Sequence, residues 1–306
     1  MNINNYQLSL NQKRIAGIVL FNPSLNRLTD NINAILHQVE LLLLIDNGSN
    51  NFSQINFLNK NEKIIIIRNN NNKGIAYALN QILGYAYSHG YDWVLTLDQD
   101  SVVSPNIIDE YEKITDEKIG IIGCNIIDRN HFQDNYKEAG VEETSWVISS
   151  ASYTNTKAWK DVGGFDTKMF IDWVDLDYCT LLKKKGFHII LNHNTHILHE
   201  LGINTRIISI RGHIVYLSNR PAKRYYYIFR NYIYLSHKYP DIFPLKEQLK
   251  QSFYSIIGII IYEKHKISNF FSFCTGTFWG LFMKVSKQQT DDFLSREYNI
   301  INKSLN

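Results

Sequence analysis

Apolar positions along the 306-residue chain fall into two patterns that meet near residue 215. Before that point, short runs of Ile, Leu and Val alternate with segments of helical periodicity. The runs are apolar at successive positions, which is typical of strands buried on both faces of a parallel sheet. The pattern therefore indicates an α/β fold, a mostly parallel sheet sandwiched by helices. It predicts strands at 15–21, 41–46, 63–68, 92–98 and 119–124 and helices at 24–37, 74–89 and 105–114.

The pattern changes after about residue 145. A Gly-Gly turn at 163–164 precedes a helix that opens with acidic residues and ends in three lysines, as the helix dipole favours. Two short strands are predicted at 187–192 and 195–200, and aromatic helices at 221–238, 245–264 and 268–286. We therefore expect an α/β domain over residues 1–215 and a C-terminal helical region over residues 216–306.

The composition is that of an ordinary globular protein, with 44% hydrophobic and 20% charged residues. A formal net charge of +3 is too small to indicate a nucleic-acid partner. The three cysteines have neither metal-site nor disulfide spacing, which favours a cytoplasmic protein. The N-terminus lacks the apolar core of a signal peptide, and no apolar run reaches the length of about 18 residues that suggests a membrane span.

Polar residues follow three of the predicted strands, at the edge of the sheet where α/β proteins bind their ligands. Asn22 follows the first strand, Asp46 ends the second, and Asp98 and Asp100 lie at the end of the fourth. Two carboxylates separated by one residue on an extended strand point the same way and can share one cation. Oxygen ligands of this kind suit Mg²⁺ or Mn²⁺. A solvated turn is the alternative interpretation.

Two loops near this edge allow either a structural or a binding role. Asp46 precedes Asn-Gly, which favours a simple turn, but its carboxylate could equally accept hydrogen bonds from a nucleobase or a ribose. Gly74 opens a predicted helix, where the missing side chain lets a ligand or another backbone approach closely. Tight packing of that helix on the sheet is the favoured interpretation. The sequence contains neither a P-loop nor a G-x-G-x-x-G motif.

An acidic segment provides candidates for a general base. Asp172 and Asp175 are three residues apart and would share one face of a helix, whereas Asp177 would point elsewhere. A carboxylate near a helix N-terminus is stabilised as the anion, which is the form that a base needs near neutral pH. The alternative is an acidic first turn that only caps the helix.

Imidazole and guanidinium groups follow later in the chain. His199 lies near the end of a predicted strand, where it could complete a metal site, contact a diphosphate, or be a buried structural histidine. Arg224 and Arg230 belong to the cluster RPAKRYYYIFRN, whose guanidinium groups suit phosphate oxygens. A solvated helix face explains this cluster equally well.

Seven motifs occur in a characteristic order: VLFN, DNGS, NKGIAYALN, LDQDS, VGGFD, FIDWVDLDYC and HELG. Each is weak alone, but their order and separations resemble those of the family-two glycosyltransferases, inverting enzymes of the GT-A fold, over roughly residues 15–235. DQDS, FIDWVDLDYC and RYYYIFRN look most like the bacterial rhamnosyltransferase subgroup. The resemblance implies a nucleotide-sugar-binding catalytic domain followed by a helical appendage.

The resemblance also implies a role for each matched residue. Asp46 would bind the base of a nucleotide sugar, Asp98 would lie near the ribose and diphosphate, and Asp100 would coordinate Mg²⁺ or Mn²⁺. His199 would reach the metal or the diphosphate, so that the expected metal ligands are Asp98, Asp100 and His199. Further contacts with the nucleotide sugar are implied for Phe21, Asn22, Asn47, Gly74, Asn80, Gln99, Arg224 and Arg230.

Asp175 matches the aspartate of the family's Glu-Asp element, which is the catalytic base. The glutamate is replaced by Val174, and this replacement leaves Asp172 as a rival for the role. In the implied reaction the acceptor hydroxyl loses its proton to the base as it displaces a nucleoside diphosphate from the anomeric carbon. A single displacement inverts that carbon without a covalent intermediate on the protein.

The implied function is the transfer of a sugar, by best guess L-rhamnose from dTDP-rhamnose, to a hydroxyl of a cell-surface glycan or a lipid-linked oligosaccharide. A UDP-hexose or N-acetylhexosamine transferase is the alternative within the family. A nucleotidyltransferase would show a Gly-rich basic loop after the first strand, where FNPSLNRL has only Arg27. A non-catalytic nucleotide-sugar-binding protein is a third interpretation, against which the intact DQDS motif and Asp175 argue.

The segment 264–287 has basic flanks around an apolar centre. It could lie in a membrane interface, as a peripheral contact on the inner face of the cell membrane, where it would bring the enzyme to a lipid-linked acceptor. Packing on the catalytic domain, or on a second subunit of a homo-oligomer, is slightly favoured, because no segment is long enough to span a bilayer.

Overall fold

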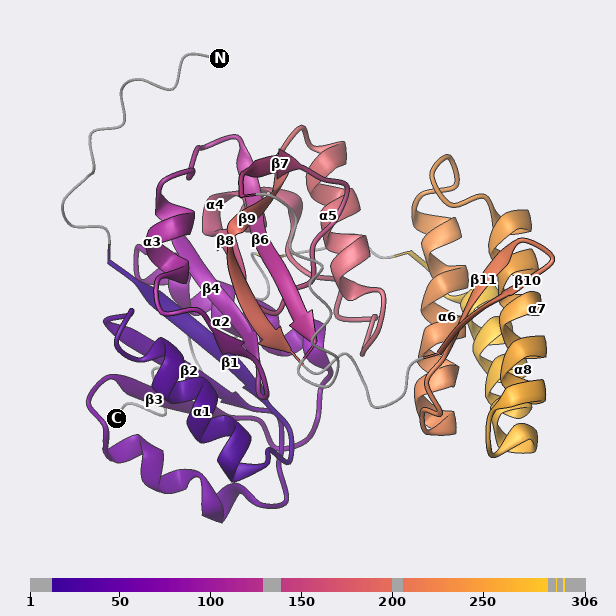
Figure 1. The fold of residues 1–306 in the computed structure, drawn as a ribbon, viewed down its shortest axis with the longest axis horizontal. Helices are drawn as coiled ribbons and strands as arrows, with labels where there is room; N and C mark the ends of the chain where they lie inside the picture. The colour runs from indigo at the N-terminus through magenta and orange to yellow at the C-terminus, as the bar shows by residue number, and fades with distance from the viewer. Residues whose placement is uncertain (1–12, 129–138, 200–205, 286–289, 291–293, 295–306) are drawn as a thin grey trace.

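A computed structural model describes residues 13–128, 139–199, 206–285, 290 and 294. The chain forms a large part, in which a sheet carries helices on both faces, and a smaller C-terminal part made of a hairpin and helices (Figure 1). We call them the α/β part and the C-terminal part. The α/β class with a helical C-terminal region is therefore confirmed.

The central sheet accounts for all five strands predicted in the first half of the chain. In the described residues its strands are β1 (Ile15–Leu20), β2 (Leu41–Asp46), β3 (Ile64–Arg68), β4 (Trp93–Asp98), β5 (Val102–Val103), β6 (Ile119–Asp128), β7 (Val141–Glu143), β8 (Ser152–Asn155) and β9 (His188–His199). Their order is β3-β2-β1-β4-β8-β6-β9-β5, with β7 paired to β9. The first four strands are parallel, and β8 runs antiparallel between β4 and β6.

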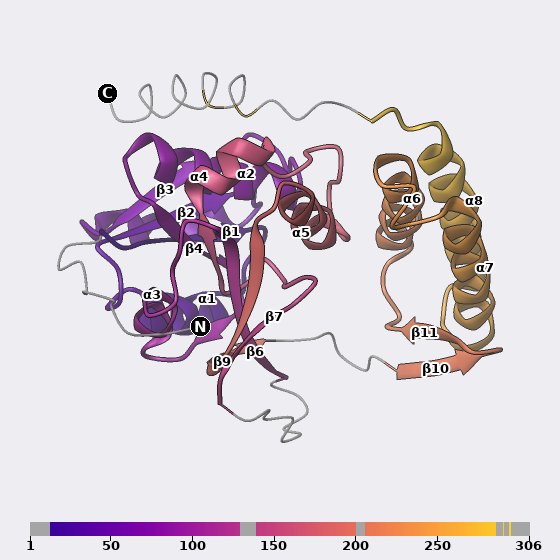
Figure 2. The same ribbon diagram turned by 90° about the horizontal axis from the view of Figure 1, so that it is seen from above.

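Helices cover both faces of the sheet, and each face has its own apolar core (Figure 2). This double cover explains why β1 and β2 are apolar at nearly every position and buried at every position except Leu41. One face carries α1 (Leu25–Ile35) and α3 (Ile107–Glu112). The other face carries α2 (Ile75–Ser88), α4 (Thr156–Val162) and α5 (Val174–Lys184). Two 3₁₀ turns, Phe52–Gln54 and Asn56–Lys60, follow β2.

The two short strands predicted after α5 are in fact one strand, β9. Polar residues in its middle break the apolar pattern without ending the strand. Asn192 is buried, and its amide donates to a backbone carbonyl of α3. A shift in register against β6 between Cys124 and Asn125 absorbs the irregularity. The continuous strand delivers His199 to the sheet edge at which β4 also ends.

The C-terminal part begins earlier than expected. It comprises the hairpin β10 (Arg206–Ile210) and β11 (His213–Leu217) and, among the described residues, α6 (Ala222–Lys238), α7 (Leu245–Tyr262) and α8 (Lys266–Phe282). The hairpin shares a small apolar core with α6 and α7. The boundary expected between residues 215 and 216 would therefore divide β11, and we propose to place it between β9 and β10.

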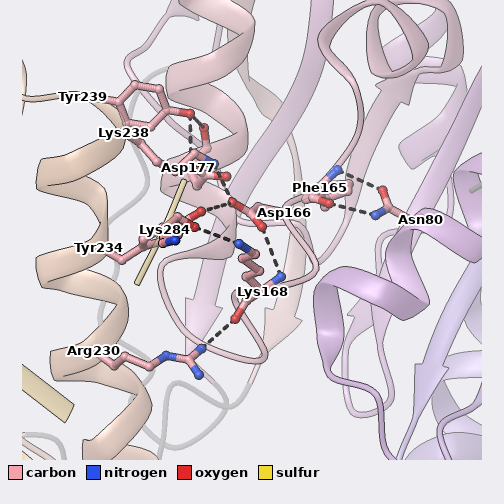
Figure 3. Close-up of polar contacts among 10 residues, drawn as sticks. All are labelled: Asn80, Phe165, Asp166, Lys168, Asp177, Arg230, Tyr234, Lys238, Tyr239 and Lys284. Atoms are coloured by element: carbon pink, nitrogen blue, oxygen red, sulfur yellow. Dashed lines mark hydrogen bonds and ion pairs between the residues drawn. The ribbon is translucent and has the colours of Figure 1, made fainter. Parts of the chain in front are cut away.

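A buried ionic network joins α6 to the α/β part (Figure 3). Lys238 Nζ lies 2.9 Å from Asp166 Oδ2 and 2.6 Å from Asp177 Oδ1, and all three side chains are buried. The Tyr234 hydroxyl donates to Asp166, and the Tyr239 hydroxyl donates to Asp177. Buried charges require such partners. The network therefore fixes the position of α6 against α5.

Candidate active site

The carboxyl end of β4 carries the predicted Asp98–Asp100 pair. The Asp98 backbone N–H donates to Ser150 Oγ at 3.1 Å, and the Asp98 carbonyl accepts from Asn31 Nδ2 at 2.6 Å. Asn31 precedes β4 in the sequence and Ser150 follows it, and together they hold the strand end at which both carboxylates lie.

His199 meets the two aspartates from the end of β9. One potential ligand atom from each of Asp98, Asp100 and His199 lies within 4.8 Å of the other two. Ser101 Oγ is 2.9 Å from His199 Nδ1 and 2.7 Å from Ser150 Oγ, which fixes the orientation of the ring. Two carboxylates and one imidazole form a donor set that fits a divalent cation such as Mn²⁺. The predicted grouping of these three residues is thus present.

The electrostatics of this group also suit a cation. Burial raises the pKa of Asp98 above its ordinary value; His199 and Arg224 oppose this rise, and the Asp100 carboxylate adds to it. Two carboxylates in a partly buried place repel each other, and a bound cation would relieve that repulsion. Sequence reasoning missed Ser101 and Ser150, because a serine near a strand end carries no specific signal.

Asp46 and Asn47 lie below the surface of the loops that follow β2. The Asp46 carboxylate has no exposed area, accepts a hydrogen bond from the Ser49 N–H at 3.2 Å and lies 3.3 Å from Arg68 Nε. The Asn47 side chain bonds to the backbone of residues 73–74. Both residues therefore shape the loops of this edge, and a direct contact of either with a nucleotide stays a prediction.

Phe21, Asn22 and Gln99 lie where β1 and β4 end. Gln99 Oε1 accepts a hydrogen bond from the Phe21 N–H at 2.8 Å, which ties the two strand ends together. The Asn22 N–H donates to Ser49 Oγ at the same distance. The Phe21 ring is exposed at this edge, where an aromatic ring can stack on a planar base.

Gly74 and Asn80 have structural roles, and the nucleotide-sugar contacts expected for them stay predictions. Gly74 has a φ of 90°, and a Cβ there would lie 2.5 Å from the Phe170 carbonyl oxygen, so it is a backbone that approaches this glycine. Asn80 is buried, and its side chain bonds to the backbone N–H and carbonyl of Phe165 (Figure 3). Its Oδ1 also accepts a hydrogen bond from Trp159 Nε1. Both residues position the loop before α5.

Asp175 lies in the first turn of α5, and its side chain is partly buried. Burial raises its pKa to about 7; hydrogen bonding with Ser149 opposes the rise, and the charges of Asp98 and Asp172 add to it. The influence of Asp98 indicates that the two carboxylates belong to one site. A carboxylate with a pKa near 7 is well matched to accept a proton at physiological pH.

Asp172 does not share a helix face with Asp175, contrary to the prediction. Asp172 and Trp173 both have positive φ values, 65° and 66°, and α5 begins only after them. The Asp172 carboxylate accepts hydrogen bonds from Arg220 Nη1 at 3.1 Å and from Arg224 Nη2 at 3.0 Å. Oxygens that are paired with two guanidinium groups are poorly placed to take a substrate proton. Asp172 instead holds the start of α6 beside the site.

Arg230 lies farther along α6 and braces the loop before α5. Its Nη2 donates to the Lys168 carbonyl at 2.7 Å (Figure 3). Its Nε donates to Asn231 Oδ1, and its guanidinium lies 4.8 Å from the centre of the Tyr227 ring. A contact of Arg230 with the nucleotide sugar stays a prediction. Arg224, the other arginine of the predicted set, acts on Asp98, because its positive charge lowers the pKa of that carboxyl group.

A cleft of about 920 Å³ lies between the two parts of the molecule. Asp175, Trp146 and Trp173 line its α/β side, and the hairpin, α6 and α7 line the other side, where the Tyr216 ring is exposed. The described lining residues do not include Asp98. Asp175 lines the cleft, and the charge of Asp98 acts on its carboxyl group. No sequence pattern predicted the aromatic lining of the cleft, because its members come from distant segments.

The sequence model of glycosyl transferase family 2 matches residues 16–172, which is just over half of the chain. The chain belongs to glycosyl transferase family 2. This family 2 glycosyltransferase is 28% identical over 278 residues to the dTDP-rhamnosyl transferase RfbF of Shigella flexneri, and the match covers 84% of this chain and 92% of RfbF. The resemblance to the rhamnosyltransferase subgroup is thereby confirmed.

Solved structures with the GT-A fold resemble this glycosyltransferase in overall shape. The crystal structure of GalNAc-T7 with UDP, GalNAc and Mn²⁺ has a TM-score of 0.58 at 12% identity, covering 90% of this chain and 57% of GalNAc-T7. That of S. aureus TarS 1–349 with UDP-GlcNAc has a TM-score of 0.58 at 15% identity, covering 86% of this chain and 79% of TarS. At these identities the likeness establishes the fold alone.

Proposed function

We propose that this glycosyltransferase transfers L-rhamnose from dTDP-rhamnose to a hydroxyl of a saccharide acceptor, either a free glycan or a lipid-linked oligosaccharide, with inversion of the anomeric carbon. The observation that carries the proposal is the place of Asp175, a partly buried carboxylate of α5 that lines the cleft and whose pKa is raised to about 7, mainly by burial. The similarity to a dTDP-rhamnosyl transferase supports the choice of donor.

The donor would bind at the carboxyl ends of β1, β2 and β4. Asp98, Asp100 and His199 would hold Mn²⁺ or Mg²⁺, and the cation, when bound, would stabilise negative charge on the diphosphate leaving group. Arg224 would add a second positive charge near the same phosphates. The exposed Phe21 ring would stack on the base.

Asp175 would act as the general base. The acceptor hydroxyl gains nucleophilic character as its proton moves to the Asp175 carboxylate, while its oxygen bonds to the anomeric carbon on the face opposite the departing diphosphate. Asp172 is the weaker candidate, because its oxygens already accept hydrogen bonds from Arg220 and Arg224. One displacement of this kind inverts the anomeric carbon.

The acceptor would occupy the cleft. Binding sites of this size are typically lined by aromatic side chains with a few polar groups that fix orientation. Trp146, Trp173 and Tyr216 offer apolar ring faces for a sugar to stack on. Ser252 also lines the cleft, and its buried hydroxyl has no hydrogen-bond partner among the described residues. A hydroxyl of the acceptor would satisfy it.

Thermal denaturation with dTDP, UDP or GDP, each with Mn²⁺ or Mg²⁺, tests the donor site. A ligand that binds only the native state raises Tm, so we expect the largest rise with dTDP plus a cation. Asp100→Asn should abolish the cation-dependent part of the rise. Asp30→Asn, at an exposed site on α1, is the matched control and should retain it. A rise with UDP and none with dTDP would exclude the proposed donor.

Product analysis tests the reaction itself. We expect turnover of dTDP-rhamnose with a saccharide acceptor, and a glycosidic bond whose anomeric configuration, measured by NMR, is opposite to that of the donor. Retention of configuration would contradict the role of Asp175 as a base for direct displacement. Turnover of a UDP-hexose or a UDP-N-acetylhexosamine in its place would reassign the donor within the same family.

A further inference from the structure

The buried positions of α8, on the face that packs on α6, are small or polar residues. They are Asn269, Gly276 and Gly280. A Cβ at Gly276 would lie 2.5 Å from the Tyr226 carbonyl oxygen, and one at Gly280 would lie 2.6 Å from the Arg230 carbonyl oxygen. The two glycines therefore let α8 lie directly against the backbone of α6.

The large apolar residues of α8 face the opposite way. Their spacing of three and four residues places most of them on one stripe of the helix. Five of them, Ile267, Phe271, Phe278, Trp279 and Phe282, have side chains whose exposed fractions run from 54% to 76%. We define the α8 stripe as Ile267, Phe271, Phe278, Trp279 and Phe282 together with the exposed Cys274.

The position of α8 leaves this stripe open. α6 lies between the α/β part and the α7–α8 pair in both views (Figures 1 and 2). A contiguous apolar patch on a protein surface marks a site of interaction with a partner or a membrane. None of the described helices is long and apolar enough to cross a membrane, so any contact of α8 with lipid must be made along its side.

We propose that the α8 stripe docks on an anionic lipid surface, with α8 lying in the plane of the membrane. Charge supports this choice of partner. Residues 264–285 contain no Asp or Glu, and the exposed Lys264 and Lys266 stand at one end of the stripe and Lys284 at the other. Basic ends complement anionic headgroups, while the aromatic side chains enter the interface.

A second copy of the chain fits this surface less well. In a two-fold dimer through the α8 stripe, an antiparallel arrangement brings Lys264 and Lys266 near Lys284 of the other copy. A parallel arrangement brings each lysine near its own equivalent. Because no acidic residue lies in the segment, neither arrangement pairs these charges, whereas anionic lipid headgroups do.

Cys274 supplies a reporter inside the stripe, because it is exposed while Cys124 and Cys179 are buried. The full chain, labelled at Cys274 with a polarity-sensitive fluorophore, is mixed with vesicles of phosphatidylcholine alone or of phosphatidylcholine and phosphatidylglycerol in equal amounts. We expect a blue shift and co-flotation with the mixed vesicles only, weakened by added salt.

Two double variants and one control test the stripe. Phe278→Ser with Phe282→Ser should lower partition into mixed vesicles about tenfold or more, because the variant lacks two apolar rings whose transfer from water into the membrane favours binding. Lys264→Glu with Lys266→Glu should also weaken binding. Phe57→Ser removes a similarly exposed ring from the α/β part and should change nothing.

Two outcomes would overturn the proposal. The first is a failure of the stripe to act in lipid binding: either the wild type does not bind mixed vesicles, or the phenylalanine double variant binds them equally well. The second is that the wild type binds no vesicles but self-associates in ultracentrifugation, and that the double variant abolishes this self-association. This second outcome would assign the stripe to a second copy. The lipid contact does not depend on the proposed reaction, so failure of either leaves the other standing.

Discussion

Asp175 is the residue on which the proposed chemistry depends most directly. Asp175→Asn preserves the shape of the side chain but removes the proton acceptor, so we expect the transfer rate to fall about 10²-fold or more. Asp172→Asn should reduce the rate less, because Asp172 only holds Arg220 and Arg224 in place. Steady-state kinetics of both variants measure the difference, and a larger loss in Asp172→Asn would move the base to that residue.

The raised pKa of Asp175 also predicts how stability depends on pH. In the unfolded chain this carboxyl loses its proton near its ordinary pKa of 3.8, but in the folded protein it keeps the proton up to about pH 7. Its contribution to stability therefore falls as pH rises from about 4 to about 7 and is constant above that. Asp175→Asn removes this penalty and should stabilise the protein by about 1 to 3 kcal/mol at pH 8.

Chemical denaturation of Asp175→Asn and wild type at pH 4.5 and at pH 8 measures this effect, with Asp30→Asn as the exposed control. The two free-energy differences should diverge only for Asp175→Asn. A stabilisation that is equal at both pH values would show that the carboxyl titrates normally in the folded protein.

Individual site residues differ in how far the sequence could predict them. Asp98 ends β4, Asp100 lies in the turn after it, and His199 ends β9; the three meet because β5, which follows that turn, pairs with the end of β9. The hydrogen-bond partners of Asp172 and Asn80 could not be predicted, because these partners, Arg220 and Trp159, lie 48 and 79 residues away in the sequence. Polar residues of this kind look alike in a sequence whether they face a ligand or a neighbour.

At the scale of elements, continuous apolar runs predicted the strands of the sheet well, because burial on both faces leaves few positions for polar residues. The same rule failed at β9, where buried polar residues interrupt the run. The start of α5 was also missed: Asp172 and Trp173 adopt positive φ values, which residues other than glycine rarely do. Only tertiary contacts hold them there.

The contact between α6 and α8 allows a test in which two effects have opposite signs. In an open helix position, Gly280→Ala would stabilise by about 1 kcal/mol through helix propensity. Here the added Cβ would lie 2.6 Å from the Arg230 carbonyl oxygen, so we expect a loss of about 1 to 3 kcal/mol. Thr275→Ala, at an exposed position of the same helix, is the control. A higher Tm for Gly280→Ala would contradict the close packing of the two helices.

At the scale of the whole molecule, the sequence indicated two parts but gave no sign of how they meet. Lys238 reads as an ordinary basic residue at a helix C-terminus. In the structure it is buried between Asp166 and Asp177, and this contact sets one wall of the cleft against the other. The interface therefore links the stability of α6 to the geometry of the proposed acceptor site.

Lys238→Met should expose that link. Removal of the ammonium leaves two buried carboxylates without their cation, and we expect a loss of about 3 to 5 kcal/mol in the free energy of unfolding. Lys157→Met breaks an ion pair with Asp92 in which both side chains are largely exposed, and should cost less than about 1 kcal/mol. Denaturant titrations of the two variants make the comparison, and equal losses would mean that the network contributes no more than a surface pair.

The same variant should affect the two substrates unequally. In the proposed arrangement the donor lies mainly on the α/β part and receives only Arg224 from α6, whereas the cleft has walls on both parts, so a shift of α6 should disturb the acceptor more than the donor. We expect Lys238→Met to raise KM for the acceptor more than KM for the donor. Adding Asp177→Asn removes one of the stranded charges and should recover part of both the stability and the acceptor KM. A variant whose donor KM alone rises would show that the buried network supports the nucleotide edge of the sheet, and that the cleft keeps its shape without it.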